Sequence, residues 1–244
     1  MTSVICCDAI DLIDSLDDNS VHLFLTDPPY GGIVDDKWDN EHSTVDQYVE
    51  WFSTIVMHMV PKMTDDGSLV FFGANGYHGW HPMWQLVRSL EDILTLRDVI
   101  TWKKRRAYGK LTSYLYTREE IVWMSKSEGR LDVRFNIPLS DELRGYDGFN
   151  SKYKAKSPYK RITNVWTDIH ELMRPRRTAE KPVALMERLV STHSLVGDLV
   201  IDPFAGLGPT GVASLKLGRK FIGCDLDQSA VDIAERDCSA VITT

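Results

Sequence analysis

An apolar run that ends in the sequence Asp-Pro-Pro-Tyr constrains the fold of this chain more than any other feature. The run, residues 21–25, has the length of a buried strand and is followed by Thr26 and Asp27. Because Pro28 and Pro29 fix φ and lack backbone N–H donors, the chain can continue neither a sheet ladder nor a helix at once. The sequence therefore predicts a stiff corner at the carboxyl end of a strand, where open α/β sheets bind their ligands.

The groups at this corner suit a planar amine. The Asp27 carboxylate and the Pro28 carbonyl are neighbouring hydrogen-bond acceptors, and an amino group has two N–H bonds to donate. Tyr30 offers a flat face on which a ring can stack, so an amino-bearing nucleobase fits. Taken alone, these residues are equally compatible with a strand that ends in a Pro-Pro turn carrying a surface tyrosine.

The composition indicates an ordinary globular protein with one large α/β domain, or one domain plus a small insertion. The chain has 244 residues, of which 43% are apolar and 26% are charged. We find no apolar run long enough for a membrane span and no signal-peptide pattern, so we expect a cytoplasmic protein. The net charge of −7 argues weakly against a nucleic-acid partner, unless the charges are unevenly distributed.

Strand-like and helix-like segments alternate along most of the chain. We expect strands at residues 4–7, 21–25, 68–72, 96–102, 120–124, 199–201 and 220–224, and helices at 9–16, 45–59, 81–90, 182–190 and 212–217. This alternation predicts a doubly wound sheet. Asp8, after the first strand, is compatible with a ligand contact and equally with the N-cap of the helix that follows.

The segment from Arg144 to Arg177 is basic, although the chain as a whole is acidic. It carries nine Lys and Arg against three Asp and Glu, a local charge of +6, with five aromatic residues interleaved. Phosphate contact and base stacking use this combination, whereas a solvated insertion is the alternative interpretation. The residues that we predict to bind nucleic acid are Lys152, Lys154, Lys156, Lys160, Arg161, Arg174 and Arg176.

A glycine-bearing loop near the C-terminus forms a second centre. The sequence Asp-Pro-Phe at residues 202–204 precedes glycines at 206, 208 and 211, and the next strand ends in Asp225. Glycines let a ligand approach the backbone at a helix N-terminus, and the acid can accept ribose hydroxyls. An acidic strand end suits a cation better than a pyrophosphate. S-adenosylmethionine (SAM), with its ammonium and sulfonium groups, therefore fits better than NAD.

The two centres together resemble the amino-methyltransferases of DNA. DPPY at residues 27–30 and DPFAGLG at 202–208 occur in the circularly permuted order often called the beta class, in which the catalytic half comes first. Two departures affect the donor side. Pro209 stands where the family usually has Thr or Ser, and Arg177 and Ala179 stand where His and Thr often precede a Lys-Pro pair.

The resemblance implies a fold and a division of the chain. The fold is a mostly parallel, doubly wound, seven-stranded Rossmann-like methyltransferase sheet with a small basic target-recognition insertion. Residues 1–127 would form the catalytic half of the methyltransferase domain, 128–177 the target-recognition region, and 178–244 the cofactor-binding half.

The resemblance also implies a reaction, in which SAM donates a methyl group to the exocyclic amine of a flipped base without a metal or a covalent base adduct. The implied catalytic residues are Asp27, Pro28, Pro29 and Tyr30. The implied donor-binding residues are Asp8, Lys181, Pro182, Asp202, Pro203, Phe204, Ala205, Gly206, Gly208, Thr210, Asp225 and Leu226.

Within this family, Asp27 as the first letter of the tetrapeptide favours adenine N6, since relatives that act on cytosine N4 more often carry Ser. The alternatives are cytosine N4, RNA or a protein glutamine as the target, a non-catalytic DNA-binding subunit, and a Rossmann oxidoreductase. The expected partner is double-stranded DNA, and a homodimer and a cognate restriction enzyme are further partners that the resemblance suggests. The expected location is the cytoplasm, in association with the nucleoid.

Overall fold

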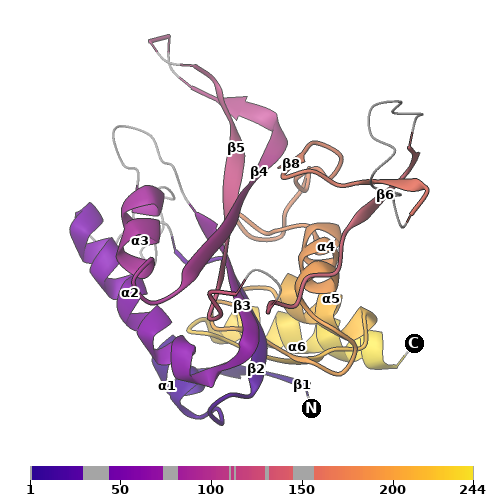
Figure 1. Cartoon of the computed structure of the whole chain (residues 1–244). Coiled ribbons are helices and arrows are strands. Elements are labelled where there is room, and N and C mark those ends of the chain that lie inside the picture. Colours follow the sequence, from indigo (N-terminus) through magenta and orange to yellow (C-terminus); the bar gives the residue numbers. More distant parts are fainter. Residues whose placement is uncertain are drawn as a thin grey trace.

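The computed structural model describes residues 2–29, 44–73, 82–109, 111–112, 114–129, 132–144 and 157–243. Along the chain its elements are β1 (Thr2–Cys6), α1 (Ala9–Asp14), β2 (Val21–Thr26), α2 (Val45–Lys62), β3 (Met63–Gly73), α3 (Pro82–Leu90), β4 (Thr95–Tyr108), β5 (Tyr116–Ser125), β6 (Leu139–Leu143), β7 (Tyr159–Arg161), β8 (Val165–Trp166), α4 (Val183–His193), β9 (Leu199–Asp202), α5 (Pro209–Lys216), β10 (Lys220–Asp225) and α6 (Gln228–Ile242) (Figure 1). No helix in these ranges is both long enough and apolar enough to cross a membrane.

Eight strands form one sheet in the order β1-β10-β9-β2-β3-β5-β4-β8, and β6 pairs with β7 in a separate ribbon. Neighbours in the sheet are parallel except around β5, which runs antiparallel to β3 and β4. The prediction of a mostly parallel α/β sheet is confirmed. The expected strand number of seven is wrong for the described residues, because β8 pairs through Val165 and Trp166 with the outer edge of β4. A two-residue strand has no periodicity that a sequence could reveal.

Helices cover both faces of the sheet, as the alternation of elements predicts. Helices α1, α2 and α3 contribute to one buried cluster, and α4, α5 and α6 contribute to the other. Leu23 and Leu25 of β2 belong to the second cluster and Phe24 to the first, because successive side chains of a strand point to opposite faces. A strand buried on both faces must be apolar throughout, which is why residues 21–25 form a nearly continuous apolar run.

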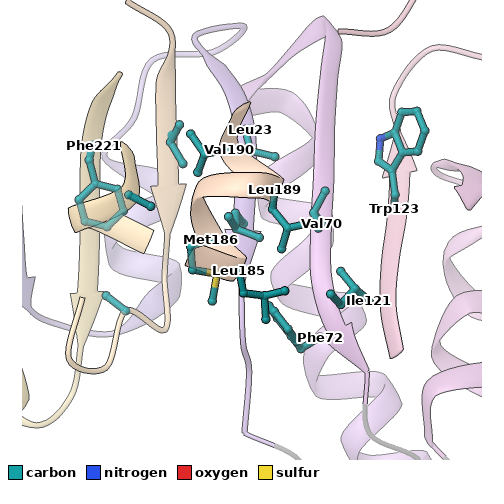
Figure 2. Packing of buried hydrophobic residues seen from close by; sticks show 14 of the residues in the cluster. Leu23, Val70, Phe72, Ile121, Trp123, Leu185, Met186, Leu189, Val190 and Phe221 are labelled. Atoms are coloured by element: carbon teal, nitrogen blue, oxygen red, sulfur yellow. The ribbon is translucent and has the colours of Figure 1, made fainter. Parts of the chain in front are cut away.

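Helix α4 packs against the face of the sheet at β3. Figure 2 shows Leu185 and Leu189 of α4 beside Val70 and Phe72 of β3, all of them buried in the same cluster. Pro182 is the N-cap residue of α4, so the helix begins immediately after the Lys-Pro pair. The packing of α4 therefore fixes where Lys181 emerges.

The neighbouring strands β2 and β9 bring the two sequence motifs together. Leu23 pairs with Val200 and Phe24 with Ile201, in parallel register. Because parallel strands end at the same edge of a sheet, the Asp27 corner and the loop after Asp202 lie side by side. The Thr26 hydroxyl donates a hydrogen bond of 2.9 Å to Asp202 Oδ1 across 176 residues of sequence.

Candidate active site

One cavity borders both motifs at this edge of the sheet. It is lined on one side by Asp27, Pro28 and Pro29, and on the other by the loop that follows β9. The predicted donor-binding residues that also line it are Asp8, Lys181, Asp202, Pro203, Phe204, Ala205, Gly206, Thr210, Asp225 and Leu226. The structure thus brings together acceptors for an amine and a glycine loop for a nucleoside-like ligand, which the sequence separates by more than 170 residues.

The Asp27 carboxylate is in contact with a buried cation. Lys181 Nζ donates a hydrogen bond to Asp27 Oδ2, lies 3.5 Å from Glu119 Oε2, and sits 4.8 Å from the ring centre of Phe72. Burial lowers the pKa of Lys181, but the two carboxylates outweigh burial and raise that pKa above its ordinary value. Lys181, whose side chain is only 3% exposed, is therefore a permanent positive charge at the site.

Glu119 of β5 links Lys181 to a second cation. Its carboxylate accepts a hydrogen bond from Lys104 of β4, in addition to the ion pair with Lys181. Burial would raise the pKa of Glu119, but Lys181 and Lys104 lower it below its ordinary value. Four groups of alternating sign, Asp27, Lys181, Glu119 and Lys104, thus form a row that we call the charge row.

The next residue of β5, Glu120, faces the opposite side of the sheet. It accepts a 2.7 Å hydrogen bond from the Thr101 hydroxyl and lies 3.0 Å from Arg118 Nε. Glu119 and Glu120 are therefore adjacent acids of the same strand, of which only Glu119 belongs to the charge row.

Asp202 ends β9 and is almost fully buried at 3% exposure. Its Oδ1 accepts hydrogen bonds from Thr26 Oγ1 and from the Phe204 amide at 3.1 Å, and its Oδ2 accepts one of 2.7 Å from Thr210 Oγ1. Burial raises the pKa of Asp202 to about 7, although these donors oppose the shift. The carboxyl therefore titrates near neutral pH, at a point where a bound cation would favour its ionised form.

The two glycines of the loop differ in what they face. Gly206 has a φ of 52°, and its amide donates a hydrogen bond of 2.9 Å to Asp225 Oδ2. A Cβ at Gly206 would meet no atom within 4 Å. Gly208 has φ of 78°, and a Cβ there would lie 2.7 Å from that of Ala234 in α6. Gly206 therefore leaves open space along the cavity, whereas Gly208 allows α6 to pack against the start of α5.

Asp8 serves as the N-cap of α1 and also lines the cavity, so the two interpretations of this residue are compatible. Its side chain accepts a 2.8 Å hydrogen bond from the Ile10 amide. At the far side of the cavity, Asp225 Oδ1 accepts a 3.0 Å hydrogen bond from the Asp227 amide and lies 3.8 Å from Arg177 Nη1. Arg177, one of the residues at which the sequence departs from the family pattern, also lines the cavity.

Several predicted residues lie elsewhere or outside the described ranges. Pro182 and Gly208 do not line the cavity, because Pro182 caps α4 and Gly208 packs on Ala234. Tyr30, Lys152, Lys154 and Lys156 lie outside the described residues. Sequence reasoning missed Glu119 and the cavity-lining residue Trp51, because nothing in their local patterns distinguishes them from surface or core residues. The sequence marks Arg177 only as a departure from the family pattern on the donor side.

The predicted DNA-binding residues that the structure describes fall into two groups. Lys160 pairs with Glu142 at 2.8 Å, and Arg176 donates to both Glu180 and Asp237. Arg161 and Arg174 are exposed and have no carboxylate partner in the described part of the chain. The hydrogen bonds of Arg176 fasten the segment before α4 to α6, so this guanidinium is already engaged.

The fold and the cavity define a doubly wound α/β protein with a nucleoside-type site beside an amine-accepting corner. The model of the DNA methylase family, N6_N4_Mtase, matches residues 21–236. This chain belongs to that family, and the predicted DNA methyltransferase is confirmed. The beta-class order of the motifs stays a prediction.

Individual relatives agree with this assignment. The Type II methyltransferase M.HpaI of Haemophilus parainfluenzae is 25% identical over 238 residues, which cover 95% of this chain and 72% of that protein. The fold resembles the PvuII DNA methyltransferase (cytosine-N4-specific), with a TM-score of 0.73, 18% identity, and coverage of 99% of this chain and 92% of that one. It also resembles the M1.HpyAVI–SAM complex, with a TM-score of 0.64, 22% identity, and coverage of 97% and 98%.

Proposed function

We propose that this protein transfers a methyl group from SAM to the N6 amino group of an adenine flipped out of double-stranded DNA. The observation that carries the proposal is the single cavity bordered by the Asp27–Pro28 acceptor pair and by the glycine loop after β9. Family membership and the SAM in the M1.HpyAVI complex support the identity of the donor.

The residues of the donor side fit SAM in charge and in shape. Asp202 and Asp225 are carboxyl groups that suit an ammonium group and ribose hydroxyls, respectively, and the open space at Gly206 admits a ligand close to the backbone. Phe204 lines the same wall. When bound, SAM supplies an electrophilic methyl group, whose carbon–sulfur bond breaks as the carbon–nitrogen bond forms.

The residues of the acceptor side position the amine. The Asp27 carboxylate and the Pro28 carbonyl each accept a hydrogen bond from one N–H of the amino group. These two hydrogen bonds turn the nitrogen lone pair out of conjugation with the ring and toward the methyl group. The Asp27 carboxylate stabilises the positive charge that develops on nitrogen, and the amine then releases one proton to solvent. Positioning supplies most of the rate enhancement. We assign Tyr30, from the resemblance, to stacking on the flipped base.

Lys181 contributes through Asp27. The contact with Lys181 favours the ionised carboxylate, and an ionised carboxylate has only acceptor sites for the amine. We therefore assign Lys181 to the positioning of Asp27, in addition to its place in the wall of the donor cavity.

The choice of adenine depends on Asp27 as the first letter of the tetrapeptide, and cytosine N4 is the alternative. We assign DNA contact to the region 128–177, through Arg161 and Arg174 among the described residues. The nucleoid as location, a homodimer and a cognate restriction enzyme are further proposals. The Type II name of M.HpaI supports the last of these.

The test is methylation of total genomic DNA by the purified protein with labelled SAM, followed by nucleoside analysis and mapping of the modified positions. We expect N6-methyladenine at a fixed short sequence. The Asp27→Ala variant should bind SAM normally and transfer no methyl group. N4-methylcytosine would reverse the base assignment, and absence of label in DNA despite SAM binding would refute the proposal.

A further inference from the structure

The β4–β5 hairpin extends well beyond the body of the sheet (Figure 1). Trp102 of β4 is buried against the core, whereas the chain from Lys103 to Arg118 carries the ribbon outward; we call residues 103–118 the arm. At about 3.3 Å per residue, the strand from Lys103 to Tyr108 alone spans roughly 17 Å. A two-stranded ribbon of this reach is larger than a loop that merely connects two strands.

The arm is the most cationic stretch of this acidic chain. It contains six basic and no acidic residues, namely Lys103, Lys104, Arg105, Arg106, Lys110 and Arg118. At its base, Lys104 and Arg118 contact Glu119 and Glu120. The backbone amides of Arg105 and Arg106 donate hydrogen bonds to Glu171, and the Arg106 guanidinium donates one to the Met173 carbonyl. The side chains of Lys103 and Arg105 are exposed along the arm and form no ion pair with a carboxylate among the described residues. With Lys104 and Arg118 paired at the base, the other four cations still give the arm a positive charge that is complementary to a polyanion.

The described end of the arm is apolar as well as exposed. Leu111 and Tyr114 are fully accessible, at 108% and 100%, and Tyr108 and Leu115 are more than half exposed. Large side chains in such a position do not stabilise the isolated protein, because they bury nothing. An aromatic and aliphatic tip flanked by cations suits a partner that has both a charged backbone and flat apolar groups, as nucleic acid does.

The charge row locates the arm relative to the active site. Lys104, at the base of the arm, contacts Glu119, which is paired with Lys181, which in turn contacts Asp27. A nucleotide whose base reaches Asp27 therefore belongs to a duplex that passes close to the arm. The major groove of B-DNA admits a two-stranded ribbon.

We propose that the arm is a DNA-binding element that enters the major groove beside the target base, distinct in sequence from the region 128–177, which it contacts at Glu171 and Met173. Lys103 and Arg105 bind phosphates, and Leu111 and Tyr114 contact base edges. The proposal rests on DNA being the substrate, and it adds a contact surface to that function.

The first test measures binding of a duplex oligonucleotide as a function of salt for the double variant Lys103→Gln/Arg105→Gln. Loss of two phosphate contacts should weaken binding about ten-fold or more near 0.1 M salt and reduce the slope of log K against log salt by about 2. The matched control removes two exposed basic residues outside the arm, on α3 and α5, as Arg88→Gln/Lys216→Gln, and should keep the wild-type slope. An unchanged slope in the arm variant overturns the proposal.

The second test separates the tip from the charges. Leu111→Ala/Tyr114→Ala should weaken duplex binding several-fold with no change in salt slope, because apolar contacts release no counterions. Duplex RNA should compete poorly, since its major groove is too narrow for side chains to read. Wild-type binding by the tip variant, or equal competition by RNA, overturns groove insertion. If the wild-type protein bound DNA through the arm but methylated no DNA, only the proposed methyl transfer would fail.

Discussion

Among single residues, Lys181 and Glu119 determine how Asp27 can act. Replacing Lys181 with Met leaves two carboxylates facing each other without their shared cation, which raises the cost of ionising Asp27. We expect Lys181→Met to lower the single-turnover rate of methyl transfer at least ten-fold, while the dissociation constant for SAM changes less than about three-fold. Rapid quench measures the rate and calorimetry measures the dissociation constant. If Lys181 only held SAM, its replacement would raise the dissociation constant strongly and change the single-turnover rate little.

The adjacent acids of β5 provide the matched comparison. Glu119→Gln should also slow transfer, and the double variant with Lys181→Met should be no slower than Lys181→Met alone, since Glu119 acts through Lys181. Glu120→Gln, which loses its contacts with Thr101 and Arg118, should affect stability and leave the rate of transfer nearly unchanged. Equal loss of rate in both single variants would indicate damage to β5 rather than a role of the charge row.

Asp202 predicts a pH dependence of donor binding. Its pKa of about 7 is raised above the ordinary value of 3.8, so the carboxyl is mostly neutral below pH 7 and mostly charged above it. Binding of a cation must then ionise Asp202, which costs about 1.4 kcal/mol for each pH unit below 7. The affinity for SAM should therefore fall up to ten-fold between pH 7 and pH 6. In titration calorimetry, the affinity of the Asp202→Asn variant for SAM should not change with pH over this range. A wild-type affinity that is equally independent of pH would contradict the role of Asp202 in binding the cation.

At the level of elements, the two glycines of the loop from β9 to α5 have different roles: Gly208 matters for stability and Gly206 for ligand binding. Gly208→Ala combines an unfavourable φ with a 2.7 Å approach to Ala234, so we expect a loss of about 2–4 kcal/mol in the free energy of unfolding. Gly206→Ala should cost only about 1–2 kcal/mol, for its φ alone, yet weaken SAM binding more strongly because its methyl group enters open cavity space. Denaturant titration measures the free energy of unfolding of the two variants, and calorimetry measures their affinity for SAM. If the variant that loses more stability also lost more affinity, the two roles would not be distinct.

The elements also indicate where sequence reasoning succeeds. Residues 21–25 and 199–201 were predictable as strands because burial on both faces demands apolar side chains at every position. The Pro, Asp and Gly residues of the stretch 61–67 predict a turn that ends the preceding helix. This prediction is wrong, since α2 runs through Pro61 to Lys62 and β3 starts at Met63. The polar residues 64–67 fall where the pairing of β2 with β3 shifts register, so they interrupt the apolar pattern of β3 without ending the strand.

Parts of the site could not be predicted, because they depend on contacts between distant segments. The family motifs led to Asp27, Asp202 and Asp225, which the fold gathers around one cavity. The partnership of Lys181 with Glu119 depends on the segment before α4 lying beside β5 in the folded chain, and no spacing in the sequence encodes that contact. The strand at 120–124 was predicted without its exposed extension into the arm, since solvent-facing residues carry no apolar alternation.

For the molecule as a whole, the cavity joins the first thirty residues to the last seventy, so a bound donor should stabilise the entire fold. At a SAM concentration of one hundred times its dissociation constant, mass action contributes about 2.7 kcal/mol, which corresponds to an increase of roughly 5–10 °C in melting temperature for a chain of this length. Thermal unfolding with SAM and with NADH provides the check. Stabilisation by NADH without stabilisation by SAM would contradict the assignment of the cavity to SAM.

The pairing of β2 with β9 has a consequence for synthesis of the protein. The strand that precedes Asp27 is made early, but the neighbour that completes its edge begins only at Leu199. A growing chain on the ribosome therefore holds an apolar strand with one unpaired edge until most of the polypeptide has emerged, and such long-range pairing forms slowly. Incomplete chains would have the acceptor corner without the donor loop, so methyl transfer becomes available only when the late strand arrives.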